Sequence, residues 1–115
     1  MFGLWKKKPS RLERFGCKTK DDVLNRIAYM VGYAPDFPPE DEMDLSFAFA
    51  CVEYGLVRIE ELDGRPAIVA VIANVREALQ RAQRLFASGE IVPACHALQD
   101  AEDFLAPIRV KAVVA

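Results

Sequence analysis

The fold class of this chain depends on residues 54–72, which read YGLVRIEELDGRPAIVAVI. Apolar and charged residues alternate over 57–60, and a continuous apolar run follows at 67–72. Asp63-Gly64 lies between these segments, where Asp-Gly favours a two-residue type I′ turn with positive φ at both positions. The pattern therefore predicts a β-hairpin whose second strand is buried on both faces.

Two helices are predicted before this hairpin. Thr19, with Asp22 three positions later, resembles a helix cap, and the apolar spacing after it predicts a helix over about 20–33. The proline-rich segment 34–39 ends that helix. Acidic residues over 40–44 suit a helix N-terminus, and the apolar residues behind them predict a helix over 40–54, apolar on two sides and ending at Gly55.

A helical hairpin is predicted after residue 73. Asn74 and Glu77 fit a capping pair for one helix, which ends before Ser88-Gly89, and Pro93 fits the first position of a second helix. Residues 108–114 alternate and then become apolar, which makes them a candidate third strand. We therefore expect an α+β fold over residues 19–115, with two N-terminal helices, a β-hairpin and an αα-hairpin, preceded by a basic arm over residues 1–18.

Two resemblances bear on this arrangement. Residues 79–107 resemble a single tetratricopeptide helix pair. Pro107 comes one residue later than in that repeat. The residues that lie near the small and large positions of the repeat are Ala82, Leu85, Gly89, Ile91, Ala94, Leu98 and Ala101. A repeat unit needs neighbours to bury its faces, and the chain holds no second copy, so a generic αα-hairpin is favoured.

The order helix, helix, hairpin also looks like a winged-helix regulator. Base reading in such proteins requires Arg, Lys, Asn or Gln on the recognition helix. Residues 41–54 contain none of these and carry four acidic residues, which DNA phosphates would repel. The hairpin is therefore interpreted as a scaffold element, and nucleic acid is not the expected partner.

Composition and charge exclude several classes of protein. The chain has 115 residues, of which 52% are hydrophobic and 28% charged, and no apolar run is long enough for a membrane span. Three separated cysteines, with no secretory signal pattern before them, lead us to expect a cytoplasmic protein. The net charge of −2 is uneven, because residues 1–20 hold seven lysines and arginines against Glu13 alone.

This basic segment suggests contact with an anionic partner. The candidate residues are Trp5, Lys6, Lys7, Lys8, Arg11 and Arg14. Contact with an anionic membrane surface, with Phe2, Leu4 and Trp5 inserted at the interface, is one alternative, and contact with nucleic acid is another. Docking of the arm on the acidic body, or a solvated arm, is the simpler interpretation.

No catalytic, metal-binding or cofactor-binding residue is predicted, and an enzyme is not the expected class. His96 is the single histidine, and its neighbour Cys95 would point about 100 degrees away on a helix. Metal-ligand spacings such as Cys-x-x-Cys are absent from the sequence, and the six glycines are isolated. A small-molecule pocket or small enzyme without a recognised motif stays an alternative.

The functional prediction is a non-enzymatic protein that acts by association with another protein or with itself as a homodimer. High apolar content and a helix that is apolar on two sides motivate it, because interfaces use aromatic anchors. The candidate interface residues are Met43, Phe47, Phe49 and Tyr54.

Overall fold

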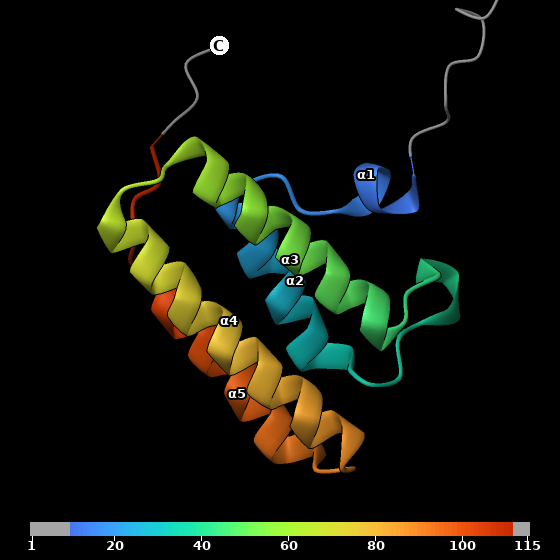
Figure 1. The fold of residues 1–115 in the computed structure, drawn as a ribbon. Helices are drawn as coiled ribbons and strands as arrows, with labels where there is room; N and C mark the ends of the chain where they lie inside the picture. The colour runs from blue at the N-terminus through green and yellow to red at the C-terminus, as the bar shows by residue number, and fades with distance from the viewer. Residues whose placement is uncertain (1–9, 112–115) are drawn as a thin grey trace, which may run out of the picture.

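The computed structural model describes residues 10–111, and this range folds into helices with no strand. The helices are α1 (Arg11–Phe15), α2 (Lys20–Tyr33), α3 (Leu45–Leu62), α4 (Pro66–Ala87) and α5 (Ile91–Leu105), with a 3-10 turn at Pro39–Asp41 (Figure 1). The α+β prediction is therefore wrong for the described residues.

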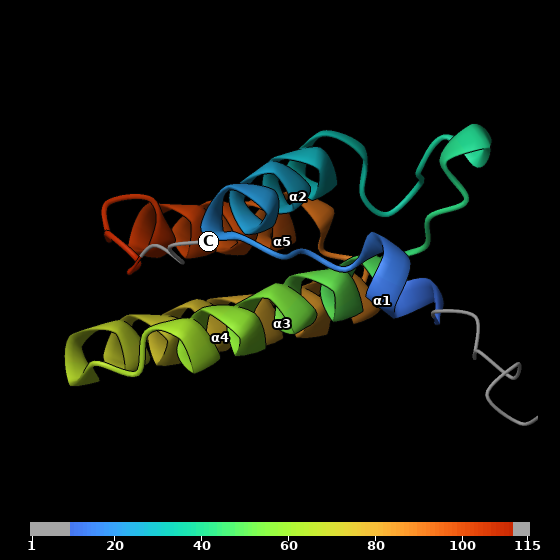
Figure 2. The same ribbon diagram turned by 90° about the horizontal axis from the view of Figure 1, so that it is seen from above.

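The four long helices form two layers. Seen from above, α2 and α5 lie in one layer and α3 and α4 in the other, while α1 lies at one end beside α3 (Figure 2). The most extensive contact joins α4 to α5, and α3 and α4 diverge from their short connection (Figure 1). The core between the layers contains Ile27, Met30, Leu56, Ile72 and Leu98, all fully buried.

The predicted first strand is the last part of α3. Leu56 and Ile59 are buried, whereas Val57 and Arg58 between them are exposed. The buried positions Val52, Leu56 and Ile59 have the spacing of one helix face. They do not alternate with exposed positions as in a strand. A short apolar run fits both the helical period and the strand period. Here the buried face packs against α2 and α4, and this packing favours the helix.

The Asp63-Gly64 pair connects two helices and forms no hairpin turn. A type I′ turn needs positive φ at both residues, but Asp63 has φ −142° and Gly89 is the single glycine with positive φ in the described range. Asp63 ends α3 as its C-cap, and Pro66 begins α4 at the first helical position, where a missing N–H costs nothing.

The predicted second strand is the first part of α4. Ile68 and Ile72 are buried, but Val69 is 41% exposed, so the segment is not buried on both faces as a central strand would be. Asn74 and Glu77 lie inside this helix, and the capping role predicted for them is wrong.

The predicted helix over 20–33 is confirmed. The Thr19 side chain accepts a hydrogen bond from the Asp22 backbone N–H at 3.1 Å, and the Asp22 carboxylate accepts one from Thr19 N–H at 3.2 Å. This reciprocal capping box fixes the start of α2. The helical hairpin is also present: α4 and α5 pack together across a turn in which Gly89 has φ +76°, and α5 begins at Ile91, two residues before Pro93.

The predicted helix over 40–54 begins later and ends later than expected. Asp44 caps α3 by accepting a hydrogen bond from the Phe47 backbone N–H at 2.8 Å. Gly55 is not a stop but lies buried inside α3, where an added Cβ would be 2.5 Å from Val23 Cγ2. At the C-terminus, residues 108–111 form no strand, and residues 112–115 lie outside the described range.

Candidate functional site

The short helix α1 brings basic residues against the beginning of α3. Ser10 caps α1 by accepting a hydrogen bond from the Glu13 backbone N–H at 3.1 Å. The Arg11 guanidinium lies 3.8 Å from the centroid of the Phe47 ring, and its Nη2 donates to the Glu42 backbone carbonyl. Two residues that were predicted for different roles, Arg11 and Phe47, are therefore in direct contact.

A cavity of about 600 Å³, here named the corner groove, lies between α1, α2 and the loop before α3. The residues that line the corner groove are Arg14, Phe15, Gly16, Cys17, Lys18, Asp22, Asn25, Arg26, Tyr29, Asp41 and Met43. Its cationic side chains come from three different segments, because Arg14 is on α1, Lys18 is in the following loop and Arg26 is on α2.

Arg26 is the central cation of this groove and is partly buried. Its Nη2 lies 3.5 Å from the Phe15 carbonyl oxygen, its Nη1 lies 3.8 Å from the Met43 sulfur, and its guanidinium carbon is 6.0 Å from the Tyr29 ring. Within residues 10–111 it forms no ion pair with a carboxylate. A guanidinium has five donors, so these long contacts leave most of its hydrogen-bonding capacity unused.

Tyr29 lines the groove next to Arg26. Its hydroxyl donates to the Asp41 carboxylate at 2.6 Å, and its ring stacks on Phe37 with centroids 5.4 Å apart and planes 9° apart. Burial, followed by the bond to the Asp41 carboxylate, raises the pKa of Tyr29 to about 12. The neutral phenol therefore holds Asp41 in place at neutral pH.

The cysteines do not supply a nucleophile in this groove. Cys17 is 3% exposed, and burial raises its pKa to about 11, which keeps it as a thiol at neutral pH. Burial also raises the pKa of Cys51. His96 lies on α5, away from the residues that line the groove, and the described part of the chain holds no group of three or more His, Cys, Asp or Glu side chains suited to a metal ion.

The predicted site residues fall into four groups, of which Phe49 alone is one. Met43 and Phe47 lie with Arg11 and Arg14 around the corner groove and a smaller cavity of about 200 Å³ beside it. The Tyr54 ring packs against Gly16, where an added Cβ would be 2.7 Å from Tyr54 Cδ1. Lys18 Nζ is 5.3 Å from the centroid of the Tyr54 ring. Trp5, Lys6, Lys7 and Lys8 lie outside the described residues.

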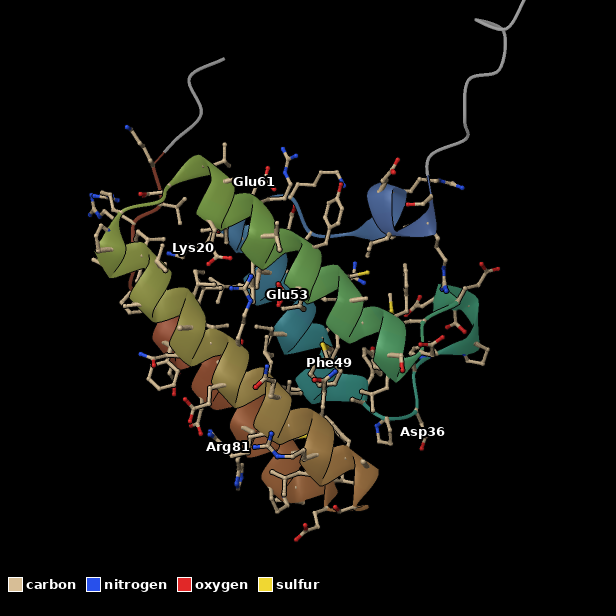
Figure 3. The ribbon with its side chains drawn as sticks, viewed as in Figure 1. Lys20, Asp36, Phe49, Glu53, Glu61 and Arg81 are labelled. Atoms are coloured by element: carbon tan, nitrogen blue, oxygen red, sulfur yellow. The ribbon has the colours of Figure 1, made fainter. Side chains whose placement is uncertain are left out.

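Phe49 is separated from the other candidates. It is 6% exposed and packs edge-on against Phe86, with ring centroids 6.4 Å apart. Phe49 and Glu53 lie on the side of α3 toward α4 (Figure 3), where the diverging helices leave a cavity of about 290 Å³. Arg76 and Glu53, which are joined by a bidentate contact at 2.8 and 2.7 Å, both line that cavity.

Sequence reasoning missed Arg26, Phe15 and Lys18. One signal could have indicated Arg26: Asp22, Arg26 and Tyr29 recur at helical spacing and mark one polar face of this helix. No signal in the sequence places the loop residue Asp41 against Tyr29, since that contact requires the folded connection between α2 and α3.

Comparisons of the chain with protein-family models, with curated proteins and with solved structures each find no match. Among the helices of residues 10–111, none combines the length and the apolar character that crossing a membrane requires.

Proposed function

We propose that this protein is a non-enzymatic binding module that associates with another protein by taking an acidic segment of its partner into the corner groove. In this proposal a partner carboxylate binds the Arg26 guanidinium. Apolar side chains next to it contact Phe15, which is 48% exposed, and Met43. Arg14 and Lys18 at the edge of the groove add electrostatic attraction.

The observation that carries the proposal is the partly buried Arg26 without a carboxylate partner in the described residues. Its contacts to the Met43 sulfur and the Phe15 carbonyl are long, so guanidinium donors remain available to a ligand that enters the groove. A planar carboxylate would accept two short parallel hydrogen bonds from the guanidinium fork, which is the strongest neutralising contact available to arginine.

The mixed charge of the groove supports a peptide over a nucleic acid. Asp22 and Asp41 line the same cavity as the three cations, so a continuous row of phosphates would meet carboxylates as well as arginines. A peptide can place single carboxylates between apolar residues and avoid this repulsion. The presence of Phe15 and Met43 beside Arg26 fits the same ligand.

Fluorescence anisotropy with labelled synthetic peptides tests this function. We expect a peptide of alternating glutamate and leucine to bind the full chain, and the same peptide with lysine in place of glutamate not to bind. Arg26→Gln should weaken binding by about ten- to a hundredfold, because a charge-assisted hydrogen bond is worth roughly 1.5–3 kcal/mol. Arg58→Gln, on the exposed side of α3, is the matched control and should bind like the wild type.

Two results would overturn the proposal. One is equal binding of the glutamate and lysine peptides, and the other is equal loss in the Arg26 and Arg58 variants. A single-stranded DNA oligomer or anionic vesicles that bind more tightly than the glutamate peptide, with the same dependence on Arg26, would instead assign the groove to one of the alternative partners.

A further inference from the structure

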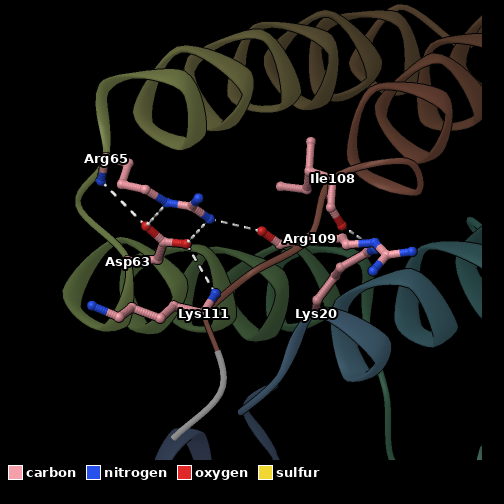
Figure 4. A network of polar contacts seen from close by, with 6 residues as sticks. All are labelled: Lys20, Asp63, Arg65, Ile108, Arg109 and Lys111. Carbon is pink, nitrogen blue, oxygen red and sulfur yellow. Dashed lines mark hydrogen bonds and ion pairs between the residues drawn. The ribbon is translucent and has the colours of Figure 1, made fainter.

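The segment after α5 is fixed to the rest of the fold by a buried carboxylate (Figure 4). Asp63 is 2% exposed, and its Oδ2 accepts a hydrogen bond from the Lys111 backbone N–H at 2.9 Å. Arg65 binds the same carboxylate through Nε at 2.8 Å and Nη2 at 2.6 Å, and Nη2 also donates to the Arg109 carbonyl at 3.0 Å. Residues 109–111 are therefore held in a defined position beside the α3–α4 connection.

Lys20 holds the same segment from the opposite side. Its ammonium donates to the Ala106 carbonyl at 2.7 Å and to the Ile108 carbonyl at 2.6 Å. Neither acceptor is charged, and within residues 10–111 Lys20 forms no ion pair. Since an ammonium group has three donors, one N–H remains available for a further acceptor.

These anchored residues line another cavity, of about 620 Å³, which we name the terminal slot. The slot lies between the start of α2, the end of α3 and the segment 108–111. Its apolar lining residues are Ile59, Leu62, Ile108 and Val110, and its charged lining residues are Lys18, Lys20, Arg109 and Lys111 with Asp21 as the single carboxylate.

We propose that the terminal slot binds an amphiphilic carboxylate, a molecule with an aliphatic chain and one anionic head group. The aliphatic chain covers Leu62, which is 38% exposed, and the half-buried Ile108 and Val110. The carboxylate accepts hydrogen bonds from Lys20 and meets the charges of Arg109 and Lys111. Lys20, Arg109 and Lys111 against the single carboxylate of Asp21 favour an anion, and the apolar lining selects one with a hydrocarbon chain.

Calorimetric titration of the full chain with decanoate, decan-1-ol and acetate tests this proposal. Decanoate has both the chain and the carboxylate, while each of the other two probes has one of them. We expect decanoate to bind tightest and to shift the amide NMR signals of residues 108–111. The double variant Arg109→Gln/Lys111→Gln should weaken decanoate binding by about three- to tenfold, as expected for two exposed charge interactions.

The double variant keeps the anchoring network, because Arg109 and Lys111 take part in it through backbone atoms alone. Arg58→Gln/Arg84→Gln removes the same charge from exposed positions outside the slot and is the matched control. The proposal is overturned if decan-1-ol or acetate binds as well as decanoate, or if both double variants bind decanoate equally. Glutamate-peptide binding at the corner groove should not change in either variant, so the two proposals fail independently.

Discussion

Asp63 is the carboxylate on which the C-terminal segment depends. It lies at the end of α3 and accepts hydrogen bonds from Arg65, two residues later, and from the Lys111 backbone, 48 residues later. The Arg65 contact, followed by the backbone N–H of Lys111, holds the pKa of Asp63 well below its usual range. The ionised form is therefore the one that the fold stabilises.

Asp63→Asn should lower the free energy of unfolding at neutral pH, because the amide cannot replace the charge-assisted bonds to Arg65. A carboxylate with a lowered folded pKa stabilises the protein above its unfolded pKa of about 4, and this contribution is lost as the pH falls through the folded value. Urea unfolding at several pH values from neutral to strongly acidic should therefore show the difference between wild type and variant shrinking below about pH 4.

Asp100→Asn is the control for this experiment. Asp100 forms an exposed ion pair with Arg81 at 2.9 Å, and such pairs contribute little to stability. A variant at Asp63 that is as stable at neutral pH as the one at Asp100 would contradict the anchoring role.

Tyr29 should ionise at a higher pH than an ordinary tyrosine. Its pKa of about 12 compares with an ordinary value of about 10, because the phenolate would be desolvated and would face the Asp41 carboxylate. Ultraviolet titration of the wild type should show a late ionisation step that Tyr29→Phe removes and Tyr33→Phe retains. Loss of the bond to Asp41 should also lower stability by about 1 kcal/mol, measured by urea unfolding. An unchanged late step in the Tyr29 variant would contradict the assignment.

At the scale of elements, α3 is the central helix of the fold. It contacts α1, α2 and α4, and its buried residues include Phe49, Val52 and Ile59. The glycine in the middle of this helix permits the close approach of α2 and of the loop that precedes it. An added Cβ at Gly55 would be 2.5 Å from Val23 Cγ2 and 2.6 Å from Cys17 Cβ.

Gly55→Ala should therefore destabilise the protein although alanine is the better helix former. Overpacking a tight contact costs roughly 1–3 kcal/mol, which exceeds the gain of about 1 kcal/mol from helix propensity. Gly32→Ala is the matched variant on α2, where an added Cβ meets no atom within 4 Å, and it should stabilise by about 0.5–1 kcal/mol. Thermal unfolding of both variants measures the contrast, and the same sign of change at both positions would contradict it.

At the scale of the whole molecule, the fold collects cations from both ends of the described chain. Lys18 and Lys20 near the start line the terminal slot together with Arg109 and Lys111 near the end. The sequence predicted a basic N-terminal segment, but it did not indicate that C-terminal cations join it. This gathering of charge supports an anionic ligand for the terminal slot.

The homodimer stays a prediction. Much of the apolar content that motivates it lies in the core, and the large exposed apolar side chains are spread over all five described helices: Phe15, Tyr33, Val57, Leu62, Val69, Val92 and Phe104. Sedimentation velocity from low to high micromolar concentration tests it. A sedimentation coefficient that rises toward the dimer value supports the homodimer, and a constant monomer value throughout contradicts it.

The sequence by itself determined those features that depend on local interactions. The capping box of Thr19 and Asp22 and the apolar spacing behind it were sufficient for α2, and the turn at Gly89 was sufficient for the hairpin of α4 and α5. Arg11, Arg14, Met43 and Phe47 were also recognised as candidates, although not as neighbours. Caps and helical periods act within a few residues, so they can be read along the chain.

Only the tertiary structure decided the conformation of residues 54–72 and the composition of the two sites. The pattern around Asp63 fits a strand or a helix locally, and the burial of Leu56, Ile59, Ile68 and Ile72 in the core selects the helix. Likewise, Arg26 lines the corner groove because α1 and the loop before α3 pack around it. Packing and desolvation act between distant segments, and for that reason the local pattern could not predict them.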